Sequence, residues 1–249
     1  MITFVFENTF EGFLTAIYDA FYSKDDVYSI ISKDDFNFDL LSETIYVESN
    51  FEKYTKVKDS IVTKIDPLAL KLIYNLFLSN QKDKGYLCYK YLKVAYRLGS
   101  NIHKHHHLSV VKELNLINRK VSLEGHRYTG FVRFKYINNK FLYSAIEPDH
   151  NILEIIAPHF KRRFANEYFI IHDIKRNLAI IYDKKDYIIS EVDKNLYDEL
   201  KDYKDNFDTL WKGYFKSTTI KERTNLKLQK RQMPLRYWHL LNEIEEDEN

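Results

Sequence analysis

Cationic residues dominate the stretch Arg223-Thr-Asn-Leu-Lys-Leu-Gln-Lys-Arg-Gln-Met-Pro-Leu-Arg-Tyr-Trp238. Between Lys212 and Arg236 there are eight lysines and arginines, and Glu222 is the only acidic residue. Cations bind phosphates, amides hydrogen-bond to base edges, and flat rings stack on bases. A helix that served only the fold would usually pair its lysines with glutamates one turn away. The stretch therefore favours a polyanionic partner, with expected contacts from Arg223, Lys227, Gln229, Arg231, Arg236, Tyr237 and Trp238. The pattern around Trp238 is equally typical of a core position.

A second group of residues, Glu147-Pro-Asp-His-Asn151, lies between a predicted strand and a predicted helix. Adjacent carboxyl and imidazole groups can perform acid–base chemistry or bind a divalent cation. The same acids could instead cap the helix and complement its dipole. If the chain is an enzyme, we expect its catalytic residues to be Glu147, Asp149, His150, His159, His172 and Asp173.

Further cations lie near these acids and near the middle of the chain. Arg162 and Arg163 follow His159 and can hold a phosphate, although ion pairs with neighbouring acids would explain them equally well. Phe131 and Arg133 alternate onto one face of a predicted strand, where a ring beside an arginine can stack on unpaired bases. A phenylalanine at such a position is also typical of a core. The predicted nucleic-acid contacts therefore include Arg127, Arg133, Arg162 and Arg163.

Composition limits the alternatives. The formal net charge is only +2, so any nucleic-acid surface must be a local patch. The single cysteine, Cys88, excludes a disulfide framework and a multi-cysteine metal site. His103 and His107 lie one helical turn apart, but spacing indicates no third ligand, so we predict no metal and no cofactor. No apolar stretch approaches the ~20 residues that span a bilayer, and we expect a cytoplasmic protein without membrane contact.

No phosphate-binding loop, dinucleotide-binding glycine motif or hydrolase nucleophile motif occurs in the sequence. P-loop nucleotide hydrolysis, nicotinamide redox chemistry and α/β-hydrolase chemistry are therefore disfavoured.

The hydrophobic pattern predicts an α+β fold, with a central antiparallel sheet of about five strands flanked by N-terminal and C-terminal helices. We expect a single domain over 1–249, with a mainly helical part at 1–120, an antiparallel sheet at 121–192 and a basic helical part at 193–245. The predicted strands are 2–6, 128–136, 141–146, 168–172, 178–182 and 186–190. The predicted helices include 67–78, 84–98, 103–118, 151–164, 195–216, 220–228 and 234–245.

Several collinear motifs resemble a bacterial family described as "probable DNA metabolism protein". They are Phe6-Glu-Asn-Thr-Phe-Glu-Gly-Phe-Leu-Thr-Ala-Ile17, Glu124-Gly-His-Arg-Tyr-Thr-Gly-Phe-Val-Arg-Phe134, Ile146-Glu-Pro-Asp-His-Asn-Ile-Leu153, Ala157-Pro-His-Phe-Lys-Arg-Arg-Phe164, Ile171-His-Asp173 and Arg231-Gln-Met-Pro-Leu-Arg-Tyr-Trp238. The family's domain is of unknown function, and it supplies no catalytic residues to transfer. Its members tend to be encoded beside a radical-SAM protein associated with DNA modification or repair, and some are fused to a uracil-DNA-glycosylase-like domain.

Three hypotheses follow from the residues and the resemblance together. The first is a DNA-binding accessory protein in DNA repair or modification, with single-stranded or damaged duplex DNA and a radical-SAM or glycosylase-like enzyme as partners. The second is an enzyme acting on DNA, such as a glycosylase, lyase or nuclease. The third is an adaptor that contacts only a partner protein. With one cysteine, the chain lacks a three-cysteine radical-SAM motif, so it is not that component itself.

Overall fold

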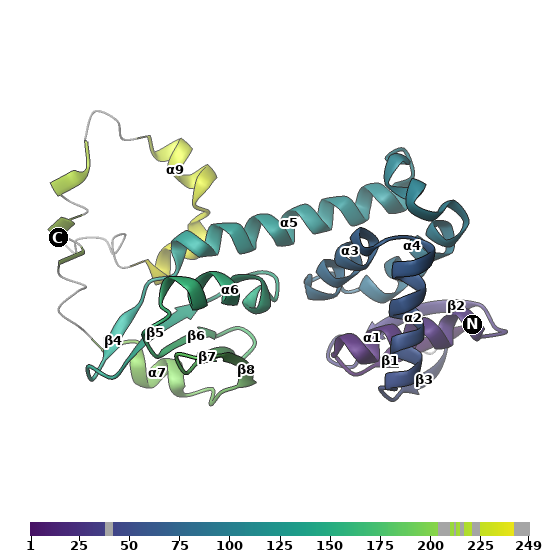
Figure 1. The fold of residues 1–249 in the computed structure, drawn as a ribbon, viewed down its shortest axis with the longest axis horizontal. Coiled ribbons are helices and arrows are strands. Elements are labelled where there is room, and N and C mark those ends of the chain that lie inside the picture. Colours follow the sequence, from purple (N-terminus) through teal and green to yellow (C-terminus); the bar gives the residue numbers. More distant parts are fainter. Residues whose placement is uncertain (38–41, 204–209, 212, 215–216, 221–224, 242–249) are drawn as a thin grey trace. The chain divides into compact units, whose positions relative to one another are not determined.

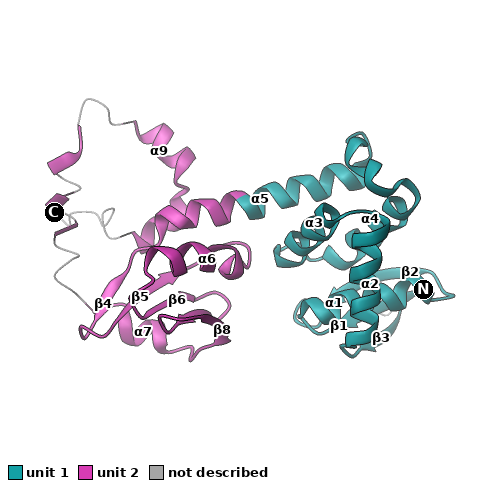
Figure 2. Cartoon of the chain, in the orientation of Figure 1, with its two compact units in different colours: residues 1–122 teal, residues 123–249 magenta. Residues whose placement is uncertain are grey.

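The computed structural model describes residues 1–37, 42–203, 210–211, 213–214, 217–220 and 225–241. The chain divides into two compact units, Met1–Ser122 and Leu123–Asn249, each with its own sheet (Figure 2). The long helix α5, Ser109–Phe131, contains the boundary between them (Figure 1). Within the described ranges, no helix combines the length and the apolar character needed to cross a bilayer.

Unit 1 is built on a three-stranded parallel sheet with the order β2-β1-β3. Its strands are β1 Ile2–Phe6, β2 Val27–Ser32 and β3 Glu43–Val47. Every residue of the central strand β1 is buried. The helices of unit 1 are α1 Phe10–Tyr22, α2 Phe51–Lys64, α3 Pro67–Leu78, α4 Lys84–Leu98, the 3-10 helix η1 Gly99–Lys104 and the first part of α5.

Local sequence explains where three of these helices begin. The side chains of Thr9, Asn50 and Asp66 each accept a hydrogen bond from a backbone N–H in the first turn of α1, α2 and α3. Such caps satisfy N–H groups that have no partner inside the helix. The predicted helices 67–78 and 84–98 are confirmed at both ends.

Unit 2 is built on a five-stranded sheet with the order β4-β5-β6-β7-β8. Its strands are β4 Lys135–Ile137, β5 Phe141–Ile146, β6 Phe169–Asp173, β7 Leu178–Tyr182 and β8 Tyr187–Glu191. Its helices are α6 Leu153–Arg163, α7 Leu196–Leu200, α9 Leu226–Gln232 and the 3-10 helix η3 Leu235–Leu240, together with the end of α5.

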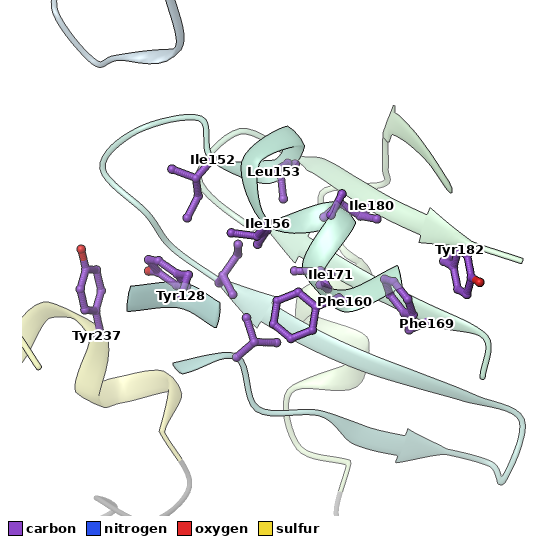
Figure 3. Close-up of a cluster of buried hydrophobic side chains, with 13 residues drawn as sticks. Tyr128, Ile152, Leu153, Ile156, Phe160, Phe169, Ile171, Ile180, Tyr182 and Tyr237 are labelled. Atoms are coloured by element: carbon purple, nitrogen blue, oxygen red, sulfur yellow. The ribbon is translucent and has the colours of Figure 1, made fainter. Parts of the chain in front are cut away.

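The core of unit 2 lies between α6 and one face of this sheet (Figure 3). Ile156 and Phe160 of α6 pack there with alternating residues of the strands, such as Ile171 and Ile180. Tyr128 from α5 and Tyr237 from η3 complete the cluster. Two segments that are distant in sequence are therefore part of one core.

The α+β class and the five-stranded sheet are confirmed, but the sheet is mixed and not wholly antiparallel. Strands β5 and β6 pair in parallel, with Leu142 opposite Phe169 and Ile146 opposite Asp173. The connection between the two strands explains this parallel pairing, because α6 follows β5 and returns the chain to the end of the sheet at which β5 began. Such a strand–helix–strand crossover joins parallel neighbours, whereas a tight turn joins antiparallel ones.

The predicted strand at 128–136 is wrong for most of its length. Helix α5 continues through Phe131, and only Lys135–Ile137 forms a strand. Aromatic and β-branched residues favour strands locally, but packing of Tyr128 and Val132 in the core holds this region outside the sheet. Phe131 and Arg133 consequently do not share a strand face. The predicted helix at 234–245 is a 3-10 helix at Leu235–Leu240 in its described part.

Candidate functional site

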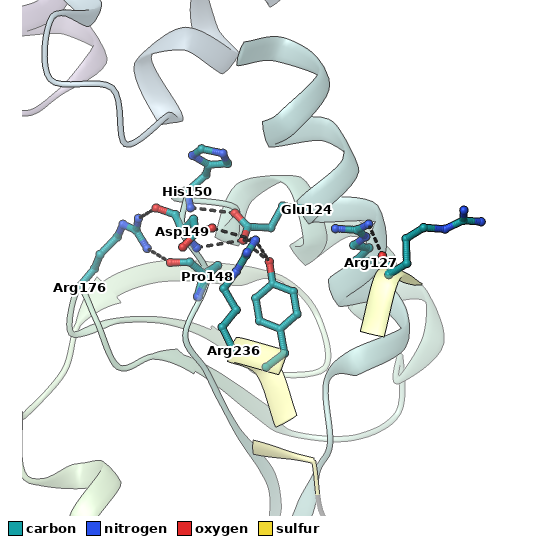
Figure 4. Close-up of polar contacts among 9 residues, drawn as sticks. Glu124, Arg127, Pro148, Asp149, His150, Arg176 and Arg236 are labelled. Carbon is teal, nitrogen blue, oxygen red and sulfur yellow. Dashed lines mark hydrogen bonds and ion pairs between the residues drawn. The ribbon is translucent and has the colours of Figure 1, made fainter. Parts of the chain in front are cut away.

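A buried carboxylate on α5 organises one end of unit 2 (Figure 4). The side chain of Glu124 is 4% exposed and accepts hydrogen bonds from the backbone N–H groups of Asp149, at 3.0 Å, and His150, at 2.8 Å. The phenol of Tyr237 donates a third hydrogen bond, at 2.5 Å. A buried charge is tolerated only when hydrogen bonds or an opposite charge replace the lost water. Glu124 thereby joins α5, the loop after β5 and the C-terminal helix η3.

Arg236 places a positive charge beside this carboxylate. Its Nη2 lies 2.8 Å from Oδ2 of Asp149 and 3.9 Å from Oε1 of Glu124, and it donates to the Tyr237 hydroxyl at 2.9 Å. Burial, and then the hydrogen bond to Glu124, raise the pKa of Tyr237. The phenol therefore stays protonated at neutral pH, as its role as donor to Glu124 requires.

A second arginine fixes the same loop from the sheet side. Arg176 donates to the carbonyl oxygens of Pro148 and Asp149, at 3.1 and 2.6 Å, and pairs with Oδ2 of Asp173 at 2.7 Å. Asp173 is fully buried; burial raises its pKa, and the charge and hydrogen bonds of Arg176 act in the opposite direction. Two arginines thus hold the loop rigidly between the sheet and η3.

A contact between a histidine and a carboxylate at the rim completes the attachment of η3. Nε2 of His239 lies 3.0 Å from Oε2 of Glu147, and both side chains are nearly half exposed. Within the same turn, Trp238 donates its indole N–H to the carbonyl oxygen of Met233 at 2.9 Å. We call Met233–Leu241 the anchor, because Arg236, Tyr237 and His239 attach it to the rest of unit 2.

The cations of α9, directly before the anchor, are arranged differently. Lys227, Lys230 and Arg231 are exposed, and none forms an ion pair with any residue that the structure describes. Asn225 caps the helix by accepting a hydrogen bond from the Leu228 N–H at 2.9 Å. Arg127 of α5 donates to the carbonyl oxygen of Arg231 at 3.3 Å. Helix α9 is therefore fixed at its end through its backbone, while its cationic side chains face solvent.

The six predicted catalytic residues do not form one cluster. Glu147, Asp149 and His150 lie on the loop that the anchor contacts, and Asp173 reaches this loop through Arg176. The side chain of His172 lies on the face of β6 opposite to that of Asp173, and its Nδ1 is 2.9 Å from the Tyr143 hydroxyl. His159 lies two turns along α6. Burial lowers the pKa of both His159 and His172, and repulsion by Arg163 and Arg162 also lowers that of His159.

The predicted nucleic-acid contacts differ in how far the fold exposes them. Arg162, Arg163, Lys227 and Arg231 are exposed, and Gln229 and Arg127 are partly exposed. Tyr237, in contrast, is 2% exposed and forms part of the core, so its ring is not accessible for stacking on a base. Trp238 is partly buried. The guanidinium of Arg133 lies over the Trp211 ring. Arg223 lies outside the described residues.

Sequence reasoning missed Glu124 and His239 as parts of this site. Glu124 is one of two glutamates on a long helix, and its partner Tyr237 is 113 residues away. The one available signal was that Glu124 begins a motif of the resemblance. Among the described residues, no group of three or more histidine, cysteine or acidic side chains could hold a metal ion.

A model of the DUF4130 family, a domain of unknown function, matches residues 82–243. The chain belongs to this family. The matched region contains Glu124, the loop at Glu147–His150, Arg176 and the anchor, so the whole site lies within the DUF4130 domain. No curated protein matches the chain.

Proposed function

We propose that the DUF4130 domain of this protein binds DNA through the exposed cations of α9, and that the protein acts as a DNA-binding accessory factor in DNA repair or modification. The observation that carries this proposal is the contrast between the anchor and α9. The fold neutralises Arg236 with carboxylates but leaves Lys227, Lys230 and Arg231 in solvent on a helix with a fixed end. Fixed, unneutralised cations are what phosphate binding requires.

Charge along this segment supports the same proposal. Residues 225–241 contain no aspartate or glutamate, so their own sequence supplies no counter-ion. Arg127, whose side chain holds the end of α9, extends the cationic surface onto α5. Arg162 and Arg163 add two exposed cations at the end of α6.

The resemblance described above supplies the biological setting of the proposal. We infer single-stranded or damaged duplex DNA as the ligand and a radical-SAM or glycosylase-like protein as the partner, in the cytoplasm of a bacterium. The catalytic alternative is less well supported, because Asp149 and Asp173 are each paired with an arginine and Glu147 is in contact with His239.

The test is fluorescence anisotropy of labelled single-stranded and duplex DNA across a salt series. We expect affinity to fall steeply with salt, and the triple variant Lys227→Ala/Lys230→Ala/Arg231→Ala to bind more weakly. On duplex DNA the slope of log K against log salt should become shallower by up to about three, because each lost phosphate contact contributes about 0.9.

A matched control is the triple variant Lys112→Ala/Arg119→Ala/Lys120→Ala. It also removes two lysines and one arginine, here from exposed positions on α5, so it changes the net charge equally. Equal weakening by both variants, or absence of DNA binding by the wild-type protein at low salt, would contradict the proposal.

A further inference from the structure

Unit 2 contains a cavity of about 220 Å³ whose lining comes from β5, α7 and the anchor. Pockets for drug-sized ligands span roughly 300–1,000 Å³, so this one suits a smaller group, such as a single ring. The rings of Tyr143 and Tyr197 line it, together with the aliphatic side chains of Leu200 and Leu240. Flat and aliphatic side chains of this kind form the walls against which a base can stack.

The backbone of β5 also lines the cavity. Strand β4 pairs with β5 only up to Tyr143, so Ser144 and Ala145 continue β5 beyond this partner and line the cavity. The side chain of Ser144 alternates with those of Tyr143 and Ala145, so its buried hydroxyl lies on the α6 face of the sheet and the backbone of Ser144 lines the cavity.

The charged side chains around the cavity include one acid, Asp202, and one lysine, Lys135, that forms no ion pair with a described residue. Lys201 pairs with Asp198 at 2.7 Å, and His239 pairs with Glu147. Nζ of Lys135 instead donates to the carbonyl oxygen of Lys201 at 2.8 Å, and no ion pair joins it to a described acid. Its positive charge is therefore not paired with a described carboxylate and is available to an anionic group of a ligand.

The anchor connects the cavity to the cations of α9, because it follows α9 in sequence and also lines the cavity. His239 and Leu240, which line the cavity, follow α9 directly through the anchor. Arg133, another lining residue, comes two residues after the end of α5, the helix whose Arg127 holds Arg231.

We propose that this cavity holds one unpaired nucleotide, with its ring between the tyrosine and leucine side chains and its phosphate near Lys135. An unpaired base reaches such a pocket at lower cost than a paired one, because no base pair has to be broken. The nucleotide can belong to a DNA strand, in which case the inference rests on the proposed function. A free nucleoside monophosphate presents the same chemistry.

The experiment compares three probes on the full chain: a fully paired duplex, the same duplex with one bulged 2-aminopurine, and free 2′-deoxyadenosine monophosphate. We expect the bulged duplex to bind about tenfold more tightly, the size of a single stacking contact. Ala145→Leu, which fills the cavity, and Lys135→Ala should abolish this preference without weakening binding to paired duplex. Lys140→Ala, at an exposed position in the turn between β4 and β5, should retain it.

The other outcomes separate failure of the nucleotide pocket from failure of the proposed function. Equal binding to bulged and paired duplex, or a preference that survives in both cavity variants, overturns the nucleotide pocket and leaves the proposed function standing. Binding of the free nucleotide alone, lost in Ala145→Leu, supports the pocket and overturns the proposed function. Absence of binding to all three probes overturns both. Thermal unfolding of each variant shows that it is folded, and Lys135→Ala provides the test if Ala145→Leu is not.

Discussion

Helix α9 and the anchor are neighbours in sequence and both carry basic residues, yet the fold uses these residues differently. In α9, Lys227, Lys230 and Arg231 face solvent without an ion pair to any described residue. In the anchor, Arg236 meets Asp149 and Glu124, and His239 meets Glu147. The comparison teaches that a cationic stretch need not be one binding surface. Part of it can attach the segment to the fold, and this leaves the other part in a fixed position for a ligand.

The largest expected effect is on the free energy of unfolding, when the carboxylate that holds the anchor is removed. Glu124→Ala leaves two backbone N–H groups and the Tyr237 hydroxyl without their acceptor in a buried site. Removing one partner from a buried charged network typically costs about 3–5 kcal/mol. We expect urea unfolding to show a loss of this size. Glu113→Ala, at an exposed position on the same helix, should leave the unfolding curve unchanged; a similar loss in both variants would show that Glu124 is not the centre of the attachment.

A smaller effect is expected from Tyr237→Phe, which keeps the ring in the core and removes only the hydroxyl. That hydroxyl donates to Glu124 and accepts from Arg236. A hydrogen bond to a charged group contributes about 1.5–3 kcal/mol, and we expect a loss near the lower value because Arg236 is half exposed. The control is Tyr46→Phe, at an exposed tyrosine in unit 1. An unfolding midpoint equal to that of the wild type would mean that packing alone holds the anchor.

The smallest expected effect is on the pH dependence of the free energy of unfolding, and it involves His172 in the sheet of unit 2. Burial lowers the pKa of His172 from its ordinary value of 6.5 in the folded protein. As the pH falls through 6.5, the unfolded chain takes up a proton that the folded chain does not, so the free energy of unfolding decreases. We expect thermal unfolding between pH 7.5 and pH 5.5 to show a smaller loss in His172→Gln than in the wild type. Identical losses would show that His172 does not contribute to this pH dependence.

Elements with strong local signals could be predicted from the sequence. Asp66-Pro67 marks the start of α3, and Gly99 marks the end of α4. The hairpin turn at Asn138-Asn139 is confirmed, because both residues have the positive φ angles, 50° and 55°, that asparagine tolerates. The predicted strand over 178–182 matches β7, which has the same bounds.

Features that depend on distant partners could not be predicted in this way. The end of α5 has strand-like residues, and its helical state depends on core packing of Tyr128 and Val132, which includes the contact of Tyr128 with Tyr237. Arg231 and Arg236 have the same side chain within one cationic run, and nothing local distinguishes the exposed one from the paired one. The distinction arises from Glu124 and Asp149, which lie about 90 to 110 residues earlier.

The most direct test of this account is a matched comparison of Arg231→Ala and Arg236→Ala. For each variant, urea unfolding and the salt dependence of duplex DNA binding are measured. We predict that Arg231→Ala makes the salt slope shallower by about one and leaves unfolding unchanged. Arg236→Ala should lower the free energy of unfolding and leave the slope unchanged. The opposite result, a shallower slope at unchanged stability for Arg236→Ala and no change in slope for Arg231→Ala, would contradict the account.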